Sequence, residues 1–414
     1  MKRTLLLLVA ALAASAVVVV TAGATPAGTP GVTDRTILLE GTFPLSGPAS
    51  GYAPIAAGMK AYFSYANAQR TPTGRGANGR QIIFKYSDDG YNPANTVQLT
   101  HQFVEQDHAF ALVGGLGTEP QLAVRDYLNQ QKVPQLFVST GATTFDRDFG
   151  QYPWTLGWQP DYEAEGAIYG KYVLKNLKTA KLGVIYQNDD YGNDYLRGLK
   201  AGLGPLGRTQ IVSAQPFDVT SPSPAVQIAT LKASGADTFV IFVTPKGTIQ
   251  SYVIATKLGW HPTAVITNSV SATDTFLTVA AKSGSDLTEG TITTSYVADP
   301  QNAKYQRAGG LALYKKIMAK YYPSGDVNNG LYTYGMAKAW TTVETLKAAG
   351  KNLTRDGLMK AARSMNFGGN PFLLPGVVIH TKGNYQFPIA QVTLVKYTNN
   401  TFQPFGSLIN GRGA

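Results

Sequence analysis

The stretch that most constrains the fold of this 414-residue chain is residues 110–143. A short apolar run, FALV, breaks into the small residues GGLGT and is followed by apolar residues at helical spacing. A second apolar run, PQLFV, breaks into STGAT. Strand, turn, helix, strand and turn in this order form a parallel βαβ unit, so the stretch predicts an α/β fold with a doubly wound parallel sheet.

The small residues that follow these two strands are the first candidate site. Ligands of open parallel sheets bind outside the carboxyl ends of the strands. Thr118 lies at one such end, and Gly141, Ala142 and Thr143 lie at the next. Free backbone N–H groups, hydroxyls and helix N-termini attract anions there, so we expect these residues to hold a carboxylate or a similarly polar group. The competing interpretation is that they only cap the helices that follow.

The same alternation extends over the rest of the chain and restarts after Trp158. Apolar runs predict strands at 36–43, 81–86, 181–186, 210–215, 238–243 and 263–267. Helical spacing predicts helices at 304–321, 330–349 and 354–365, followed by strands at 372–380 and 389–397. The restart indicates two α/β lobes in tandem rather than one long sheet.

Charge and cysteine content narrow the class of protein. The formal net charge is +11, but the basic residues are scattered along predicted helix faces, as in Lys171, Lys175 and Lys178, and no nucleic-acid motif accompanies them. We therefore expect solvated faces and no nucleic-acid partner. The chain has no cysteine, which excludes disulfides and a lipid anchor through cysteine.

The N-terminus has the order of a secretory signal peptide. Lys2 and Arg3 precede an apolar run at 5–20, and small residues continue to Ala24. This pattern predicts a signal peptide at 1–24, with an uncleaved membrane anchor as the alternative. Residues 25–34, rich in Pro and Gly, are expected to form a flexible lead-in. The mature protein would be exported, to the periplasm or the outer face of the cell membrane.

The histidines and small-residue motifs do not form a recognisable catalytic signature. The four histidines do not have metal-ligand spacing, and neither a GxSxG elbow nor a GxxxxGK[ST] phosphate loop is present. We expect no enzyme activity, no cofactor and no metal. An exported α/β hydrolase is the remote alternative.

Several short motifs, in this order and spacing, resemble one family. They are FPLSGP at 43–48, YSDD at 86–89, GGLGT at 114–118, GAT at 141–143, DYG at 190–192 and YTYGMA at 332–337. Over residues 35–405 the chain is similar to periplasmic substrate-binding proteins of the leucine/isoleucine/valine-binding type, the receptor components of ABC importers.

The resemblance implies two lobes joined by a three-crossover hinge that close over a small polar organic ligand, such as a branched-chain amino acid, an aromatic acid or an amide. One lobe would comprise 35–157 with 292–374, and the other 158–291 with 375–409. The implied partners are the ligand and the permease subunits in the membrane, and the implied state is a monomer. A ligand-sensing module of a receptor or regulator is the alternative function.

The resemblance also implies roles for single residues. The ligand contacts carried over are Tyr52 and Tyr191 as cleft aromatics, Thr118 and the loop Gly141, Ala142 and Thr143 as the carboxylate clamp, and Thr244 and Ser269 at later strand ends.

One departure concerns the ligand ammonium. Amino-acid binders of this family have an acidic residue near the position of Ser269, yet residues 267–271 read TNSVS, and the nearest acid in sequence is Asp274. An unpaired buried ammonium costs several kcal/mol. Either Asp274 substitutes, or the ligand is not an α-amino acid.

Overall fold

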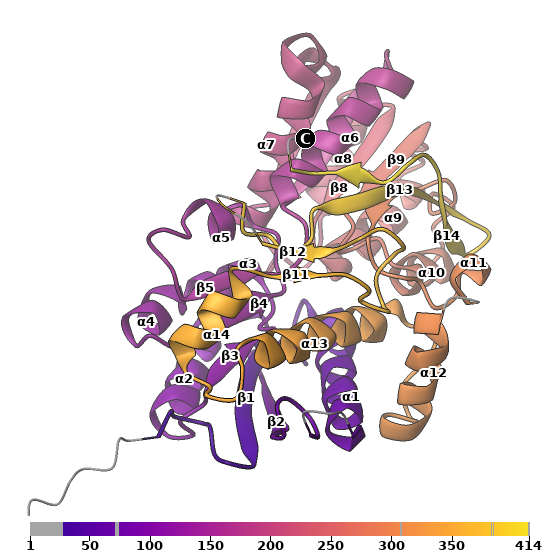
Figure 1. Cartoon of the computed structure of the whole chain (residues 1–414). Coiled ribbons are helices and arrows are strands. Elements are labelled where there is room, and N and C mark those ends of the chain that lie inside the picture. The colour runs from indigo at the N-terminus through magenta and orange to yellow at the C-terminus, as the bar shows by residue number, and fades with distance from the viewer. Residues whose placement is uncertain (1–27, 71–73, 307–308, 382, 384, 413–414) are drawn as a thin grey trace, which may run out of the picture.

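The computed structural model describes residues 28–70, 74–306, 309–381, 383 and 385–412 (Figure 1). The predicted signal peptide, 1–24, and the first part of the predicted lead-in lie outside the described residues. Among the helices of the described part, none is long and apolar enough to cross a bilayer.

The first sheet has five parallel strands in the order β2-β1-β3-β4-β5. They are β1 Thr36–Phe43, β2 Gln81–Asp88, β3 Ala111–Val113, β4 Gln135–Val138 and β5 Thr155–Gly157. The intervening helices are α1 Pro54–Ala68, α2 Pro93–Glu105, α3 Thr118–Leu122, α4 Arg125–Gln130 and α5 Thr144–Arg147, with a short 3₁₀ turn Ser50–Tyr52 before α1. Strand order 1-3-4 places the carboxyl ends of β3 and β4 side by side, as the sequence predicts.

The second sheet has the order β14-β13-β10-β9-β8-β6-β7. Its parallel strands are β6 Leu182–Gln187, β7 Ile211–Phe217, β8 Thr238–Phe242, β9 Ala264–Thr267 and β10 Ile292–Ser295. The late strands are β13 Gln391–Thr398, β14 Thr401–Pro404 and β15 Ile409–Asn410, and β13 runs antiparallel to β10. The helices are α6 Tyr162–Asn176, α7 Asp190–Gly207, α8 Ala225–Ala233, α9 Pro245–Lys257 and α10 Asp274–Lys282, with a 3₁₀ turn Arg208–Gln210 after α7.

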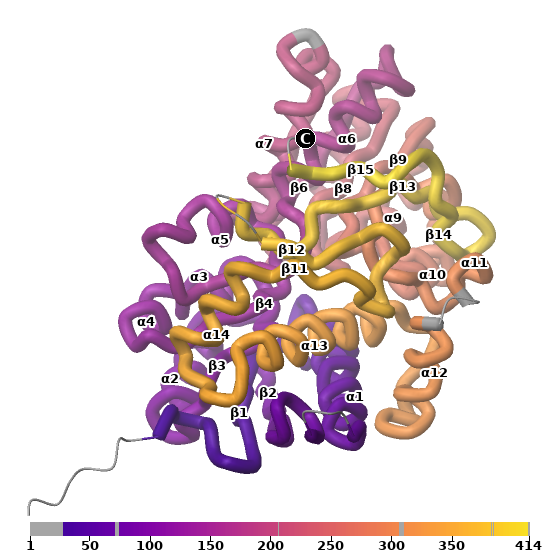
Figure 2. Tube along the Cα trace, in the orientation of Figure 1, coloured from indigo at the N-terminus to yellow at the C-terminus, as the bar shows by residue number. Residues whose placement is uncertain are grey.

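The chain crosses between the two lobes three times. After β5 it enters the second lobe, and after β10 it returns through α11 Ala303–Gln306, α12 Gly309–Tyr321, α13 Gly330–Ala348 and α14 Arg355–Ala362. It then crosses back to β13. Figure 1 shows the orange helix α13 beside α1, and the yellow strands β13 and β14 in the half that holds β8 and β9. The tube in Figure 2 shows β15 in that same half, above β13.

Two sequence predictions place the late elements incorrectly. The second crossing was predicted before residue 292, but Ile292–Ser295 is β10, whose buried β-branched side chains fill the sheet between β9 and β13. A strand was predicted over 372–380, but only β12, Ile379–His380, forms, paired with β11, Asn366–Phe367. Pro375 and Gly376, which has φ +88°, turn the chain and break the apolar run.

Helices α6 and α7 pack with their backbones in contact. A Cβ added to Gly166 would lie 2.5 Å from the Tyr195 carbonyl oxygen, and one added to Gly170 would lie 2.5 Å from that of Leu199. Only glycine permits so close an approach of two backbones. This contact fixes the side chains that α6 and α7 direct into the space between the lobes.

Candidate functional site

A partly open cavity of about 140 Å³ lies between the lobes. Six tyrosines form much of its wall: Tyr52, Tyr91, Tyr162, Tyr191, Tyr296 and Tyr334. An apolar cavity of about 150 Å³ is known to hold benzene, so this space suits a ligand of roughly that size with short polar substituents. Because side chains of both lobes line it, a bound ligand would contact both lobes at once.

Five of the eight predicted site residues line this cavity. They are Tyr52, Thr118, Tyr191, Thr244 and Ser269. The other three, Gly141, Ala142 and Thr143, are not among its lining residues. The structure thus separates the two strand-end loops that the sequence analysis treated as one clamp.

Thr118 is the first residue of α3, and the turn of residues 114–117 links it to β3. Gly117, just before it, has φ +109°. Its hydroxyl lies 2.7 Å from the hydroxyl of Thr140, which follows β4. Ser139 also lines the cavity, and its hydroxyl donates to the carbonyl of Gly114 at 2.9 Å. Hydroxyls from two adjacent strand ends therefore meet at the first-lobe wall of the cavity.

A buried lysine stands behind this wall. Lys338, on α13, is fully buried, and its Nζ donates to the Gly114 carbonyl at 3.1 Å and contacts the Ser139 hydroxyl. The ring centroid of Tyr334 lies 5.0 Å from Nζ. Burial lowers the pKa of Lys338 well below its usual range. The ion pairs found among the described residues do not include Lys338, so an anion beyond Ser139 would stabilise its charge.

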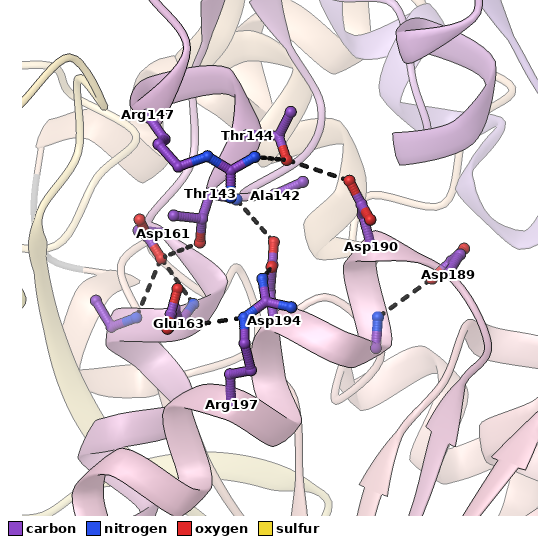
Figure 3. A network of polar contacts seen from close by, with 12 residues as sticks. Ala142, Thr143, Thr144, Arg147, Asp161, Glu163, Asp189, Asp190, Asp194 and Arg197 are labelled. Carbon is purple, nitrogen blue, oxygen red and sulfur yellow. Dashed lines mark hydrogen bonds and ion pairs between the residues drawn. The ribbon is translucent and has the colours of Figure 1, made fainter.

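The loop of Gly141, Ala142 and Thr143 contacts the second lobe instead of the cavity. The Thr143 N–H donates to Asp194 Oδ2 at 2.8 Å, and the Thr143 hydroxyl donates to Asp161 Oδ1 at 3.0 Å. The Thr144 hydroxyl donates to Asp190 Oδ2 at 3.1 Å. Figure 3 shows these contacts running from the loop to Asp161 at the start of α6 and to Asp190 and Asp194 in the first turns of α7. We call Thr143, Thr144, Asp161, Asp190 and Asp194 the interlobe clasp.

The tyrosine wall is held by its own polar contacts. The Tyr52 hydroxyl lies 3.4 Å from the Ser271 hydroxyl, so this first-lobe residue reaches the second lobe. Gln159 accepts from Tyr334 at 2.7 Å and donates to the Tyr162 hydroxyl at 2.8 Å. The Tyr191 hydroxyl is buried and has no hydrogen-bond partner in the described part of the chain. The Ser271 side chain is its polar neighbour.

Glu165 is the acidic neighbour of Ser269 that the sequence analysis missed. It lies on α6, is 2% exposed, and its Oε1 accepts from the Ser269 N–H at 2.8 Å. Its Oε2 accepts from the Ser269 hydroxyl at 2.8 Å and the Tyr195 hydroxyl at 2.9 Å, while Tyr169 also donates to Oε1. Burial raises the pKa of Glu165. Four donors already occupy this carboxylate, which makes it a brace for the Ser269 loop.

Thr244 and Ser269 mark the second-lobe strand ends. Thr244 follows β8 at the N-cap of α9, and its side chain makes no capping hydrogen bond. Ser269 follows β9 and is held by Glu165. Within the described residues, no group of three or more His, Cys, Asp or Glu side chains is placed to hold a metal ion.

Two α/β lobes built on mainly parallel sheets, three crossovers and a cavity between the lobes define a two-lobed solute-binding fold. A family model for periplasmic binding proteins matches residues 42–401, so the chain belongs to the periplasmic binding protein family.

Relatives and solved structures agree with this assignment. A Leu/Ile/Val-binding protein homolog 3 from Brucella melitensis biotype 1 is 27% identical over 166 residues, which is 39% of this chain and 43% of that protein. Alignments with the curated relatives span 36% to 50% of those proteins' own length.

Two solved structures share the fold over almost the whole chain. A fatty acid ABC transporter substrate-binding protein from Thermomonospora curvata has a TM-score of 0.76 at 20% identity, over 93% of this chain and 95% of that one. A branched chain amino acid ABC transporter from Thermus thermophilus with bound valine has a TM-score of 0.74 at 17% identity, over 91% and 96%.

Proposed function

We propose that this protein is the extracytoplasmic solute-binding receptor of an ABC importer and captures a small organic ligand by closure of its lobes. The observation that carries the proposal is the cavity of about 140 Å³ that side chains of both lobes line. A ligand that touches both walls stabilises the closed state, which a permease in the membrane can then recognise. We further propose that the receptor is exported, acts as a monomer and leaves its ligand chemically unchanged.

We place the anionic group of the ligand at Thr118 and Ser139. Both residues line the cavity and carry hydroxyl groups, and Lys338 Nζ contacts the Ser139 hydroxyl from behind, where a bound anion would stabilise its protonated form. Tyr52 and Tyr191, from opposite lobes, would enclose the less polar body of the ligand. Thr244 and Ser269 would contribute the second-lobe hydroxyls. Relatives named for leucine, isoleucine, valine and fatty acids make short carboxylic acids, with or without an amine, the first class to test.

A thermal-shift screen followed by calorimetry tests the function. The mature protein is incubated with leucine, isoleucine, valine, 4-methylpentanoate, hexanoate, aromatic acids and their amides. A ligand present at 100 times its Kd stabilises the protein by about 2.7 kcal/mol, which gives a clear rise in Tm. A Tm that stays constant across the acids and amides would contradict the proposal. Ligand recovered unaltered after incubation would support a receptor without turnover.

A further inference from the structure

Lys338 carries a buried amine that is separated from the cavity by a single residue. Its side chain is fully buried on α13, and it is not among the residues that line the cavity. Its Nζ contacts the hydroxyl of Ser139, and Ser139 does line the cavity. A change in the charge of Lys338 would therefore reach a bound ligand through Ser139.

The groups packed around Lys338 are uncharged. β1 contributes the ring of Phe43 and α13 itself contributes the ring of Tyr334, with centroids 5.8 and 5.0 Å from Nζ. Met59 of α1 lies on the same side of Gly114 as Lys338, since a Cβ added to Gly114 would be 2.7 Å from Met59 and 3.3 Å from Lys338 Cε. Tyr334 is the titratable member of this set, and burial raises its pKa, so it stays a neutral phenol. The described residues thus offer no carboxylate to balance a charge on Lys338, and burial is what lowers its pKa.

The hydrogen bonds of Ser139 depend on the protonation state of this amine. Lys338 Nζ donates to the Gly114 carbonyl at 3.1 Å, and the Ser139 hydroxyl donates to the same carbonyl at 2.9 Å. An ammonium carries three N–H donors, whereas an uncharged amine has one fewer and a lone pair instead. Once protonated, Lys338 can donate both to the Gly114 carbonyl and to Ser139 Oγ. The Ser139 O–H is then free to turn into the cavity and donate to a ligand.

A purely structural role does not require a lysine. The contacts with Gly114 and Ser139 tie the ends of β3 and β4 together, and an uncharged amide side chain could make them as well. An ammonium that is buried without a counter-charge is costly, so the free protein favours the neutral amine. A ligand anion beside Ser139 would supply the missing counter-charge. A titratable group at this position is therefore explained by the ligand better than by the fold.

Resting on the proposed function, we propose that Lys338 takes up a proton when an anionic ligand binds, and that this coupling makes the receptor select anions over uncharged analogues. The ligand anion stabilises the ammonium, and the ammonium frees the Ser139 hydroxyl to donate to the anion. The proton comes from the solvent and adds to the Nζ lone pair, so the bonds of the ligand stay unchanged. Lys338 is a positioning residue, because it acts through Ser139.

Calorimetry of the mature protein in two buffers counts the protons. The probes are the carboxylates leucine, 4-methylpentanoate, hexanoate and benzoate, and the uncharged 4-methylpentanamide, hexanamide and benzamide. The heat of binding is measured in phosphate and in Tris, whose ionisation enthalpies differ, at several pH values from about 6.5 to about 8.5, where the carboxylates stay ionised. We expect the tightest carboxylate to bind with uptake of about 0.5 to 1 proton, and an amide with less than about 0.2. Because binding consumes a proton, the Kd of the carboxylate should rise with pH, by up to about tenfold per pH unit.

Lys338→Met nearly keeps the length of the side chain and removes the amine. Its proton uptake should fall below about 0.2, its Kd for the carboxylate should rise about tenfold or more and lose its pH dependence, and its Kd for an amide should change less than about threefold. Lys360→Met, at an exposed position on α14, is the matched control and should keep both the proton uptake and the affinity. The proton count of the wild-type protein needs no variant, so it tests the coupling even if Lys338→Met folds poorly.

The outcomes distinguish this coupling from the function it rests on. If a carboxylate binds without proton uptake over the whole pH range, or if the amides bind as tightly as the carboxylates, the coupling is overturned while the receptor function stands. An uptake that persists in Lys338→Met also overturns it, and assigns the proton to the buried carboxyls at the cavity, Asp274 and Glu165. If none of these probes binds, both proposals are overturned. An uptake that is present in the wild type and in Lys360→Met but lost in Lys338→Met establishes the coupling.

Discussion

The loops that follow β3 and β4 have similar small-residue sequences but different roles. Thr118, after β3, lines the cavity and meets Thr140 there. Thr143, after β4, donates both its N–H and its hydroxyl to carboxylates beyond the first lobe's sheet. The loop after a parallel strand thus offers free hydrogen-bond donors. Whether they bind a ligand or the protein itself depends on which groups lie opposite the loop.

The largest expected effect tests the clasp. Asp194→Ala removes a buried carboxylate that accepts from the Thr143 N–H and pairs with the half-exposed Arg197. We expect urea unfolding to show a loss of about 1.5–3 kcal/mol, because the Thr143 N–H loses a charged acceptor, while the half-exposed Arg197 is solvated by water. Small-angle scattering should show a larger radius of gyration for the ligand-free protein.

The matched control is Glu163→Ala, which removes a half-exposed carboxylate 3.8 Å from the same Arg197. Its expected cost is below about 1 kcal/mol. Equal losses in the two variants would contradict a specific role of Asp194 in holding the lobes together.

The next effect tests the cavity side of the comparison. Thr118→Val is nearly isosteric and removes one hydroxyl from the first-lobe wall. The tightest ligand of the screen should bind about tenfold to a hundredfold more weakly in calorimetry, since a hydrogen bond to a charged group is worth about 1.5–3 kcal/mol. Unfolding should change by only about 1 kcal/mol, from the lost contact with Thr140. Unchanged affinity would contradict a role of Thr118 in ligand binding.

The pH dependence of stability tests the contribution of Asp161 to the clasp. Burial raises the pKa of Asp161 to about 6, whereas an unfolded Asp titrates near 3.9. Between these values the folded protein holds a proton that the unfolded chain has released, so raising the pH from about 4 to about 7 reduces the free energy of unfolding.

Asp161→Asn keeps an acceptor for Thr143 and for the α6 N–H groups that Asp161 caps. Relative to wild type, this variant should gain about 1–2 kcal/mol of unfolding free energy as the pH rises from 4 to 7. The difference between the two curves isolates Asp161 from other carboxyls. A constant difference across this range would contradict the raised pKa.

The smallest expected effect comes from Thr143→Val, the counterpart of Thr118→Val in the other loop. Thr143→Val makes the same chemical change as Thr118→Val but removes only the hydroxyl bond to Asp161, because the backbone bond to Asp194 remains. We expect a stability loss of about 1 kcal/mol and a change in ligand Kd below tenfold. An affinity loss as large as that of Thr118→Val, without a loss of stability, would show that the loop contacts the ligand after all.

The sequence predicted the sheets and the edge at which the cavity lies, because apolar runs and the small residues after them are local signals. It could not assign the donors of Thr143, since Asp161 and Asp194 lie 18 and 51 positions further along the chain. Glu165 was missed for the same reason, being 104 positions from Ser269. Its signal was an acidic residue among Tyr162 and Tyr169, at i, i+3 and i+7 on one buried helix face.

The glycine contact between α6 and α7 has a consequence for how specificity changes. Because the two backbones touch at Gly166 and Gly170, the helix pair keeps its spacing whatever side chains it carries toward the cavity. Tyr162, on α6, and Tyr191, on α7, can therefore be substituted by other residues without a change in the spacing of the two helices. A receptor built in this way can acquire a new ligand by substituting wall residues while its hinge and lobe packing stay the same.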